Sequence, residues 1–373
     1  MSDASTTERL TGARLGLAPS HPSSHGSLEL DVTVREGAIV AAEPVVGFLH
    51  RGVEKLFEVR DYRQVLALAN RHDWLAAFGN ELGAALAIES MLGMEVPPRA
   101  RRIRTLMAEL SRMISHLAFA VTLEGDVVRP GARAIEARQE LQTVMEEATG
   151  GRMHFMFNRV GGVGEELPDG WTARCRLGLA VVAGLLPEIE AELLSEEFRE
   201  RGNGVGILSE GLARAMGVSG PPARAAGLDL DLRRDDPSLA YTELGDVLRV
   251  PLRSAGDVVS RFEVLLEEVS VSLSLAEACL DLLEAEGPGP IDVRLPKVLK
   301  VPEGACYTWS EAPSGITGYY AISTGDKVPW RFKIRSPSFN TVAALSQVLP
   351  GTRTSDLGLV LASFFYIVGD IDR

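Results

Sequence analysis

The sequence contains little cysteine, and none of it is spaced to hold a metal. Its three cysteines, Cys175, Cys279 and Cys306, are odd in number and far apart in the chain, which excludes a disulfide framework and favours a reducing compartment. No CxxC pair is present, and no histidine and cysteine have the spacing of metal ligands. We therefore expect no metal ion and no iron–sulfur cluster held by this chain alone.

Positive charge and long apolar runs are scarce as well. The 38 Lys and Arg residues against 51 Asp and Glu give a formal net charge of −13, which argues against unspecific binding to nucleic acid. The most apolar stretches, near residues 177–186 and 356–368, are shorter than the roughly 18 to 20 residues of a membrane span. The first residues show no apolar core of a secretory signal, and no GxGxxG motif begins a dinucleotide site.

Apolar residues make up 46% of the 373 residues, enough for a sizeable core, and their spacing changes along the chain. Polar and apolar residues alternate over 27–34, which predicts a strand, and a return strand is expected over 38–46. Helical spacing predicts helices over 62–91, 97–121, 132–148, from 168 to a kink or end at Pro187, and from 254 to Gly287. The last part predicts strands over 305–309, 318–323 and 329–334, and short helices over 338–348 and 355–366.

These patterns predict an α+β fold that is mainly helical. It has an N-terminal β-sheet, a central bundle of long helices and a small C-terminal α/β cap. The expected division is a flexible leader at 1–18, an N-terminal β domain at 19–60, a helical bundle at 61–290 and a C-terminal α/β region at 291–373.

All six histidines lie in the first 154 residues, so proton chemistry is expected in the N-terminal half, although so small a number also clusters by chance. The best local candidate is the turn PSHPSSHG at 19–26, which can present an imidazole to a cavity. A surface turn whose histidines cap backbone groups is the competing interpretation. The charged turn GFLHRGVEK at 47–55 is expected to form a solvated or interfacial salt-bridge cluster.

Several distant blocks occur in an order that carries a family likeness. They are HPSSHG (21–26), GFLHRGVEK (47–55), LGMEVPPRARRIRTLMAELSRMISHL (92–117), GRMHFMFNRVGGV (151–163), GVGIL (204–208), RFKIRSPSF (331–339) and GDIDR (369–373). With these blocks the chain resembles the D subunit (49-kDa subunit) of respiratory complex I, the NADH:quinone oxidoreductase. That family is similar to the large subunit of nickel–iron hydrogenases, whose CxxC pairs hold nickel. Both places lack cysteine here, so the resemblance implies a hydrogenase large-subunit-like fold without its metal.

The resemblance implies a quinone headgroup site between this chain and an iron–sulfur partner subunit. His25 matches the family histidine that hydrogen-bonds a quinone carbonyl, and Asp126 matches the aspartate that pairs with it, which makes both catalytic by this likeness. Arg71 matches an arginine beside the partner's terminal tetranuclear cluster. His154 matches a histidine near the same cluster whose protonation is coupled to its reduction, and a cation there favours the extra electron.

The chain departs from the family at Trp74, where the second headgroup ligand is a tyrosine. An indole N–H donates a hydrogen bond but does not give up its proton as a phenol does, so Trp74 either stacks on a quinone ring or fills the pocket. Two hypotheses stay open. One is a quinone-site subunit of a proton-translocating NADH:quinone oxidoreductase that is inactive alone. The other is a diverged paralogue that serves structure or assembly in a related redox complex without quinone turnover. A free-standing enzyme is disfavoured, because nothing in the chain binds a redox cofactor.

The resemblance also implies partners and a location. The partners are a B-like iron–sulfur subunit that holds the tetranuclear cluster, a C-like subunit, and an H-like membrane subunit. Quinone is then the substrate, and NADH is used elsewhere in the complex. The chain is expected to be a peripheral membrane protein on the cytoplasmic side of the cell membrane.

Overall fold

The computed structural model describes the backbone of residues 7–14 and, with side chains, residues 28–121 and 131–373. About 51% of the chain is helical, and the strands form small antiparallel sheets. The predicted α+β, mainly helical fold class is therefore confirmed. The more specific likeness to a hydrogenase large subunit stays a prediction, as do the domain boundaries at residues 18, 60 and 290.

The N-terminal sheet has the strand order β1-β2-β3. Its strands are β1 (Thr7–Arg14), β2 (Glu29–Arg35) and β3 (Ala38–Val45), and both pairings are antiparallel. Leu30 and Val32 of β2 are buried, as the alternation predicted. Strand β1 lies inside the expected leader at 1–18 and pairs with β2 in this sheet. An edge strand of this kind leaves little local signal in the sequence.

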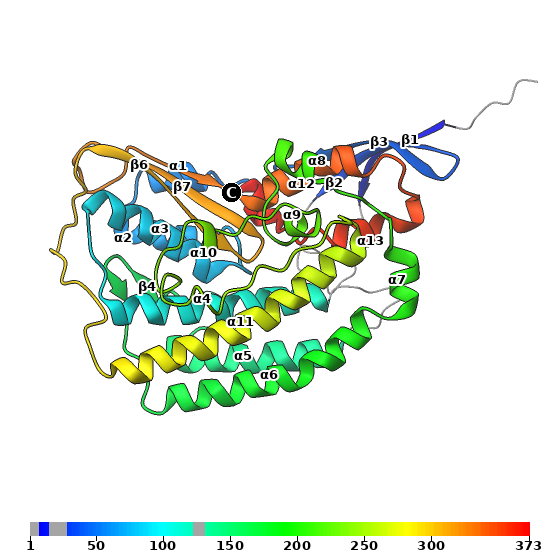
Figure 1. Cartoon of the computed structure of the whole chain (residues 1–373). Helices are drawn as coiled ribbons and strands as arrows, with labels where there is room; N and C mark the ends of the chain where they lie inside the picture. The colour runs from blue at the N-terminus through cyan, green and yellow to red at the C-terminus, as the bar shows by residue number, and fades with distance from the viewer. Residues whose placement is uncertain (1–6, 15–27, 122–130) are drawn as a thin grey trace, which may run out of the picture.

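Four long helices form the bundle in the lower half of Figure 1. They are α4 (Pro98–Ala120), α5 (Ala132–Thr149), α6 (Trp171–Leu193) and α11 (Val258–Glu286), and α4 packs against both α11 and α5. Helix α11 begins at the N-cap Asp257, whose carboxylate accepts a hydrogen bond from the Ser260 N–H, and it ends at Gly287. Helix α6 continues through Pro187, which is exposed, so water can satisfy the carbonyl that the proline leaves free.

The helix expected over 62–91 is interrupted. After α1 (Val53–Phe57), the chain forms α2 (Tyr62–Ala69) and α3 (Ala77–Leu92), which are separated by an irregular linker at residues 70–76. The Asp73 carboxylate accepts hydrogen bonds from the N–H groups of Leu75 and Ala76 at 2.9 and 3.1 Å. Such a side-chain turn competes with helical hydrogen bonding and breaks the helix here.

The C-terminal part contains a second three-stranded sheet, and both such sheets lie above the bundle in Figure 1. Its strands are β6 (Gly304–Ala312), β7 (Gly315–Ser323) and β8 (Arg331–Arg335), followed by α12 (Pro337–Val348), the 3-10 turn η1 (Thr354–Asp356), α13 (Leu357–Ala362) and α14 (Val368–Asp372). The expected strands and the helix over 338–348 are confirmed. The helix expected over 355–366 is shorter, because α13 ends at Ala362 and Phe365 has a positive φ of 51°. Helix α3 packs against β6 and β7, which brings the linker at 70–76 close to the C-terminal part.

Short elements connect these layers. They are β4 (Asn158–Arg159), β5 (Gly162–Val163), α7 (Glu196–Gly202), α8 (Glu210–Met216), α9 (Pro221–Ala225) and α10 (Leu232–Asp235). Among the described residues, no helix combines the length and the apolar character needed to cross a membrane.

Candidate functional site

The structure describes three of the five predicted site residues. Arg71 and Trp74 lie in the linker at 70–76, and His154 lies between α5 and β4. His25 and Asp126 lie outside the described residues, so their roles stay predictions.

The structure brings Arg71 and His154 together. The His154 Nδ1 atom lies 2.6 Å from the side-chain oxygen of Asn70, the residue before Arg71. Because an amide oxygen only accepts, His154 donates from Nδ1 in this contact. Burial lowers the pKa of His154, and the nearby charge of Arg71 lowers it further. The two residues that the family likeness places beside one cluster therefore share one electrostatic environment.

A buried carboxylate, Glu81 on α3, ties this pair to the core. Its Oε1 accepts hydrogen bonds from the backbone N–H groups of Phe157 and Asn158 and from the Asn158 amide, at 3.1, 3.1 and 2.9 Å. Its Oε2 accepts from the Asn70 amide at 2.9 Å. Glu81 thus joins the start of the linker to the segment that carries His154. Sequence reasoning missed Glu81 because it lies inside a regular helix among alanines.

Trp74 is half-buried and packs against the main hydrophobic core. It is preceded by Asp73, which is 2% exposed. Burial and then the charge of Asp370 raise the pKa of Asp73 to about 8. The position that the family likeness assigns to a headgroup ligand therefore holds an indole next to a carboxyl group that retains its proton near neutral pH.

The raised pKa of Asp73 predicts how stability depends on pH. An unfolded aspartate has a pKa of about 3.9, so the folded chain binds more protons between about pH 4 and about pH 8, and stability falls as pH rises through that window. Asp73→Asn keeps the oxygen that accepts from Leu75 and Ala76 but carries no charge. In urea unfolding, we expect this variant to be more stable than wild type at about pH 8, with the difference vanishing near about pH 4. A less stable variant at about pH 8 would contradict the assignment.

Sequence reasoning also missed His72, which lies in the linker two residues before Trp74. It is 2% exposed. Its Nδ1 lies 3.1 Å from Asp370 Oδ1 on α14, and its Nε2 lies 3.3 Å from the Tyr319 hydroxyl on β7. The histidine therefore points into the core, where it meets the C-terminal helix.

The charged turn at 47–55 also meets the C-terminal residues. The Asp372 carboxylate accepts hydrogen bonds from the N–H groups of Gly47 and Leu49 at 2.8 and 2.7 Å. Glu54 pairs with Arg331 at 2.7 Å and with Arg373 at 3.2 Å. The expected salt-bridge cluster is confirmed. An open hollow of about 350 Å³ lies beside it, lined by His50, Gly52, Glu54, Lys55, Arg331, Ile371, Asp372 and Arg373.

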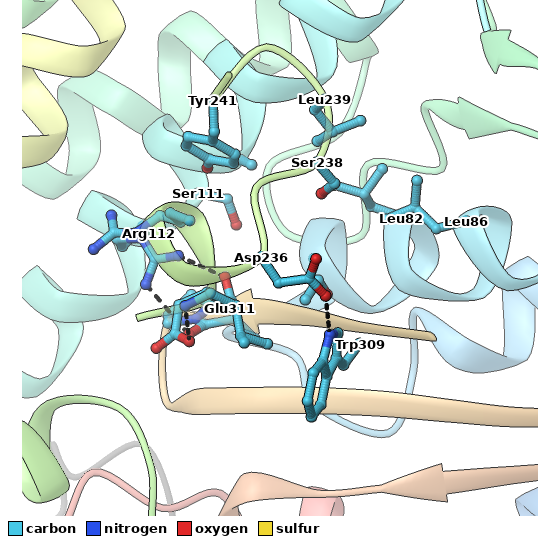
Figure 2. Close-up of a pocket in the computed structure, with 17 residues that line it drawn as sticks. Leu82, Leu86, Ser111, Arg112, Asp236, Ser238, Leu239, Tyr241, Trp309 and Glu311 are labelled. Carbon is cyan, nitrogen blue, oxygen red and sulfur yellow. Dashed lines mark hydrogen bonds between the residues drawn. The ribbon is translucent and has the colours of Figure 1, made fainter. Parts of the chain in front are cut away.

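A second polar cluster lies between α4, α9, α11 and β6, away from the linker. Its members have buried charged or titratable side chains: Glu109, Arg112, His116, Arg224, Asp231, Arg233, Glu268 and Glu311. Figure 2 shows Arg112 directed at Glu311 and the hydrogen bond from Trp309 to Asp236 at the neighbouring pocket. That pocket has a volume of about 30 Å³, which is room for about one water and too little for a quinone ring.

Metal-binding side chains do not converge in the described part of the chain: it contains no group of three or more His, Cys, Asp or Glu that could hold a metal ion. Among the described residues, buried polar side chains gather around His72, Asp73 and Asp370 at the linker and in the ionic cluster beside α4. The linker also carries Arg71 and Trp74, to which the family likeness assigns roles.

Comparison with known proteins gives consistent matches. The family described as respiratory-chain NADH dehydrogenase, 49 Kd subunit, matches residues 129–299 and 294–373. The D 1 subunit of NADH-quinone oxidoreductase from Streptomyces coelicolor is 54% identical over 362 residues, which is 96% of this chain and 94% of that protein. The D 2 subunit from Salinispora tropica is also 54% identical, over 96% of this chain and 92% of that protein. The D subunit from Carboxydothermus hydrogenoformans is 37% identical, over 96% and 98%.

Proposed function

Because the chain belongs to the 49-kDa, or D, subunit family of NADH-quinone oxidoreductases, we propose that it forms the quinone headgroup site of such a complex. It does so against an iron–sulfur partner subunit that delivers the electrons. Membership in this family makes the chain part of a multi-subunit oxidoreductase. The headgroup site, the identity of the partners and the coupling to proton translocation are the proposal.

Each proposed role follows from the chemistry of the side chain. His25, oriented by Asp126, hydrogen-bonds a quinone carbonyl and supplies a proton as the ring is reduced. Quinone takes up two electrons and two protons to give the quinol. Trp74 contacts the ring by stacking or by its N–H group. Arg71 and His154 face the partner's tetranuclear cluster, where positive charge favours reduction.

One observation supports this proposal most strongly: the shared environment of Arg71 and His154. The two residues come from segments more than 80 residues apart, yet Asn70, the neighbour of Arg71, contacts His154 at 2.6 Å and donates to Glu81 at 2.9 Å. A chain that only needed the fold would not require a cation and an imidazole at one place. The arrangement suits a surface that faces a redox centre in a partner.

The proposed partners are a B-like iron–sulfur subunit that holds the tetranuclear cluster, a C-like subunit, and an H-like membrane subunit. NADH is oxidised elsewhere in the assembly, and the chain lies peripherally on the cytoplasmic side of the membrane. Without these partners it has no source of electrons, so we expect no activity from the chain alone.

Trp74 is the observation that favours the alternative, a diverged structural paralogue without quinone turnover. Its indole cannot replace a phenol as proton donor. The two functions differ in one measurable property, which is quinone reduction by the wild-type complex.

Inhibitor-sensitive quinone reduction by the assembled complex tests the proposal, with wild type and His25→Ala compared at equal amounts of complex. We expect His25→Ala to lower the rate about 100-fold, because a positioned proton donor contributes roughly that factor. His21→Ala is the matched control in the same turn and should retain the wild-type rate. If wild type shows no turnover, or if His25→Ala equals His21→Ala, the chain is a structural subunit.

A further inference from the structure

The linker at 70–76 carries Arg71 and Trp74 but has no regular secondary structure, so side-chain contacts must fix it. Asn70 anchors its start to Glu81, and Asp73 closes its end by the local turn onto α3. His72, between them, is the linker residue whose side chain reaches the C-terminal helix α14. The contacts of the His72 side chain therefore help to fix the position of the linker.

Both ring nitrogens of His72 have a neighbour in the core. Nε2 lies 3.3 Å from the Tyr319 hydroxyl, which donates its hydrogen to the carbonyl of Asn80 at 2.9 Å. On the other side, Nδ1 lies 3.1 Å from the Asp370 carboxylate. A bare nitrogen lone pair would be repelled by that carboxylate, so Nδ1 carries the proton that faces it. The His72 side chain is therefore held between β7 and α14.

Asp370 is suited to accept from His72. Burial opposes its ionisation, but its interaction with His72 and hydrogen bonds from Ser338 and Ser336 keep its pKa below the usual range. The Ser338 N–H donates to Asp370 Oδ2 at 3.1 Å. Among the described residues, Asp73, Tyr319 and Arg335 also interact electrostatically with Asp370. Because both members of the pair are almost fully buried, removing either leaves the other without its partner in the core.

Helix α14 connects this pair to the rest of the site. Its backbone lies so close to the linker that a Cβ atom at Gly369 would be 2.6 Å from the His72 carbonyl oxygen. Two residues after Asp370, the Asp372 carboxylate holds the N–H groups of Gly47 and Leu49. A short buried helix thus joins the linker that carries Trp74 to the turn at 47–55.

We propose that the His72–Asp370 pair is the positioning element of the quinone site: it clamps α14 onto the linker and so fixes Trp74 and Arg71. His72 acts through these residues and does not itself contact the substrate. The role of the clamp in quinone reduction rests on the proposed function, whereas the clamp itself does not.

The test compares wild type, His72→Gln and His116→Gln in the assembled complex. His116 is the matched control, because it is also a buried histidine paired with a carboxylate, Glu268 at 3.0 Å, but lies in the ionic cluster. Hydrogen exchange of backbone amides, followed by mass spectrometry, measures the clamp. In His72→Gln, but not in His116→Gln, the amides of 70–76, 368–372, Gly47 and Leu49 should exchange at least about tenfold faster than in wild type. The kcat/KM for quinone should also fall about tenfold or more in that variant alone.

A double variant separates positioning from general damage. His72→Gln with Asp370→Asn replaces the pair by two amides that can hydrogen-bond to each other, so it should recover part of the kcat/KM lost in either single variant. Unchanged exchange in His72→Gln, or the same changes in His116→Gln, would overturn the clamp. A wild-type complex without quinone turnover, but with the expected exchange pattern, would overturn the proposed function and leave the clamp standing.

Discussion

Arg224→Met is expected to destabilise the folded chain by at least about 4 kcal/mol, because it leaves buried carboxylates without their cation. Arg224 lies on α9 and is fully buried. Its Nε donates to Glu268 at 2.8 Å, and its Nη1 donates to Glu311 at 2.8 Å and to the Leu230 carbonyl at 3.0 Å. Folded domains are typically stable by only about 5–15 kcal/mol, so this one change approaches the whole margin.

The charge count of the ionic cluster explains the size of the effect. Three guanidinium groups, those of Arg112, Arg224 and Arg233, face four carboxylates, those of Glu109, Asp231, Glu268 and Glu311. Removing Arg224 leaves two cations for four buried carboxylates. Glu268 then loses the largest of the charges that oppose its burial, since Arg224, His116 and Arg233 together hold its pKa at about 2 in wild type.

The pH dependence of this variant has a defined sign. In wild type, the depressed pKa of Glu268 adds stability above its unfolded pKa, and this stability is lost as pH falls toward about 2. In Arg224→Met, the unpaired carboxylates gain protons more easily in the folded chain, so the destabilisation is largest at neutral pH. We therefore expect the difference between variant and wild type to shrink as pH falls from about 7 to about 4.

Urea unfolding of the two chains measures both effects, and Arg176→Met is the matched control. Arg176 also contacts several carboxylates, Glu277, Asp281 and Glu284, but at the surface between α6 and α11. Its loss should cost below about 1 kcal/mol. An equal loss of unfolding free energy in Arg224→Met and Arg176→Met would show that burial does not determine the size of the effect.

Periodic segments of this chain could be predicted from sequence, whereas buried charge could not. The apolar stripe of α4, from Ile103 to Leu117, predicted the helix and one packing face. Its other face carries Glu109, Arg112 and His116, which helical spacing treats as solvent-exposed. The structure buries this face too, against α11 and β6, and the charges are satisfied by partners more than 100 residues away. A single sequence contains no record of such distant pairing.

The candidate site shows the same division. Arg71, Trp74 and His154 were assigned by family likeness, and the structure places Arg71 and His154 in one environment. His72 was missed because the linker at 70–76 breaks an otherwise continuous helical pattern. Helical spacing therefore does not show that its side chain reaches Asp370 on α14. Asp370 and Asp372 were seen only as part of the block at 369–373. Their importance comes from α14 folding back onto residues near the other end of the chain.

Glu81→Ala is expected to lower the free energy of unfolding by about 3–5 kcal/mol and to move His154 away from Arg71. The Glu81 carboxylate is the acceptor for four donors, two backbone N–H groups and the amides of Asn70 and Asn158. Truncation leaves all four without their acceptor in a buried place, and each unsatisfied group costs roughly 1–3 kcal/mol, partly relieved by relaxation. The segment that carries His154 then loses its anchor on α3, because Phe157 and Asn158 no longer donate to Glu81, and the imidazole can move away from Arg71.

Glu81→Gln separates the charge of this group from its hydrogen bonds. A glutamine oxygen can still accept from Phe157 and Asn158, but its amide group meets the Asn70 amide, donor against donor. Asn70 cannot simply flip, because its oxygen is bonded to His154 and its nitrogen also donates to the Ala77 carbonyl at 3.2 Å. We therefore expect Glu81→Gln to cost about 1–3 kcal/mol, less than the alanine variant.

Urea unfolding of both variants measures these costs, and the titration of His154 by NMR measures the loss of contact. In wild type, burial and the charge of Arg71 lower the pKa of His154. Release of the segment that carries His154 exposes the imidazole and moves it away from Arg71, so its pKa should rise toward about 6.5, most clearly in Glu81→Ala. An unchanged titration in that variant would mean that Glu81 supports only the fold, and that another contact holds the imidazole beside Arg71.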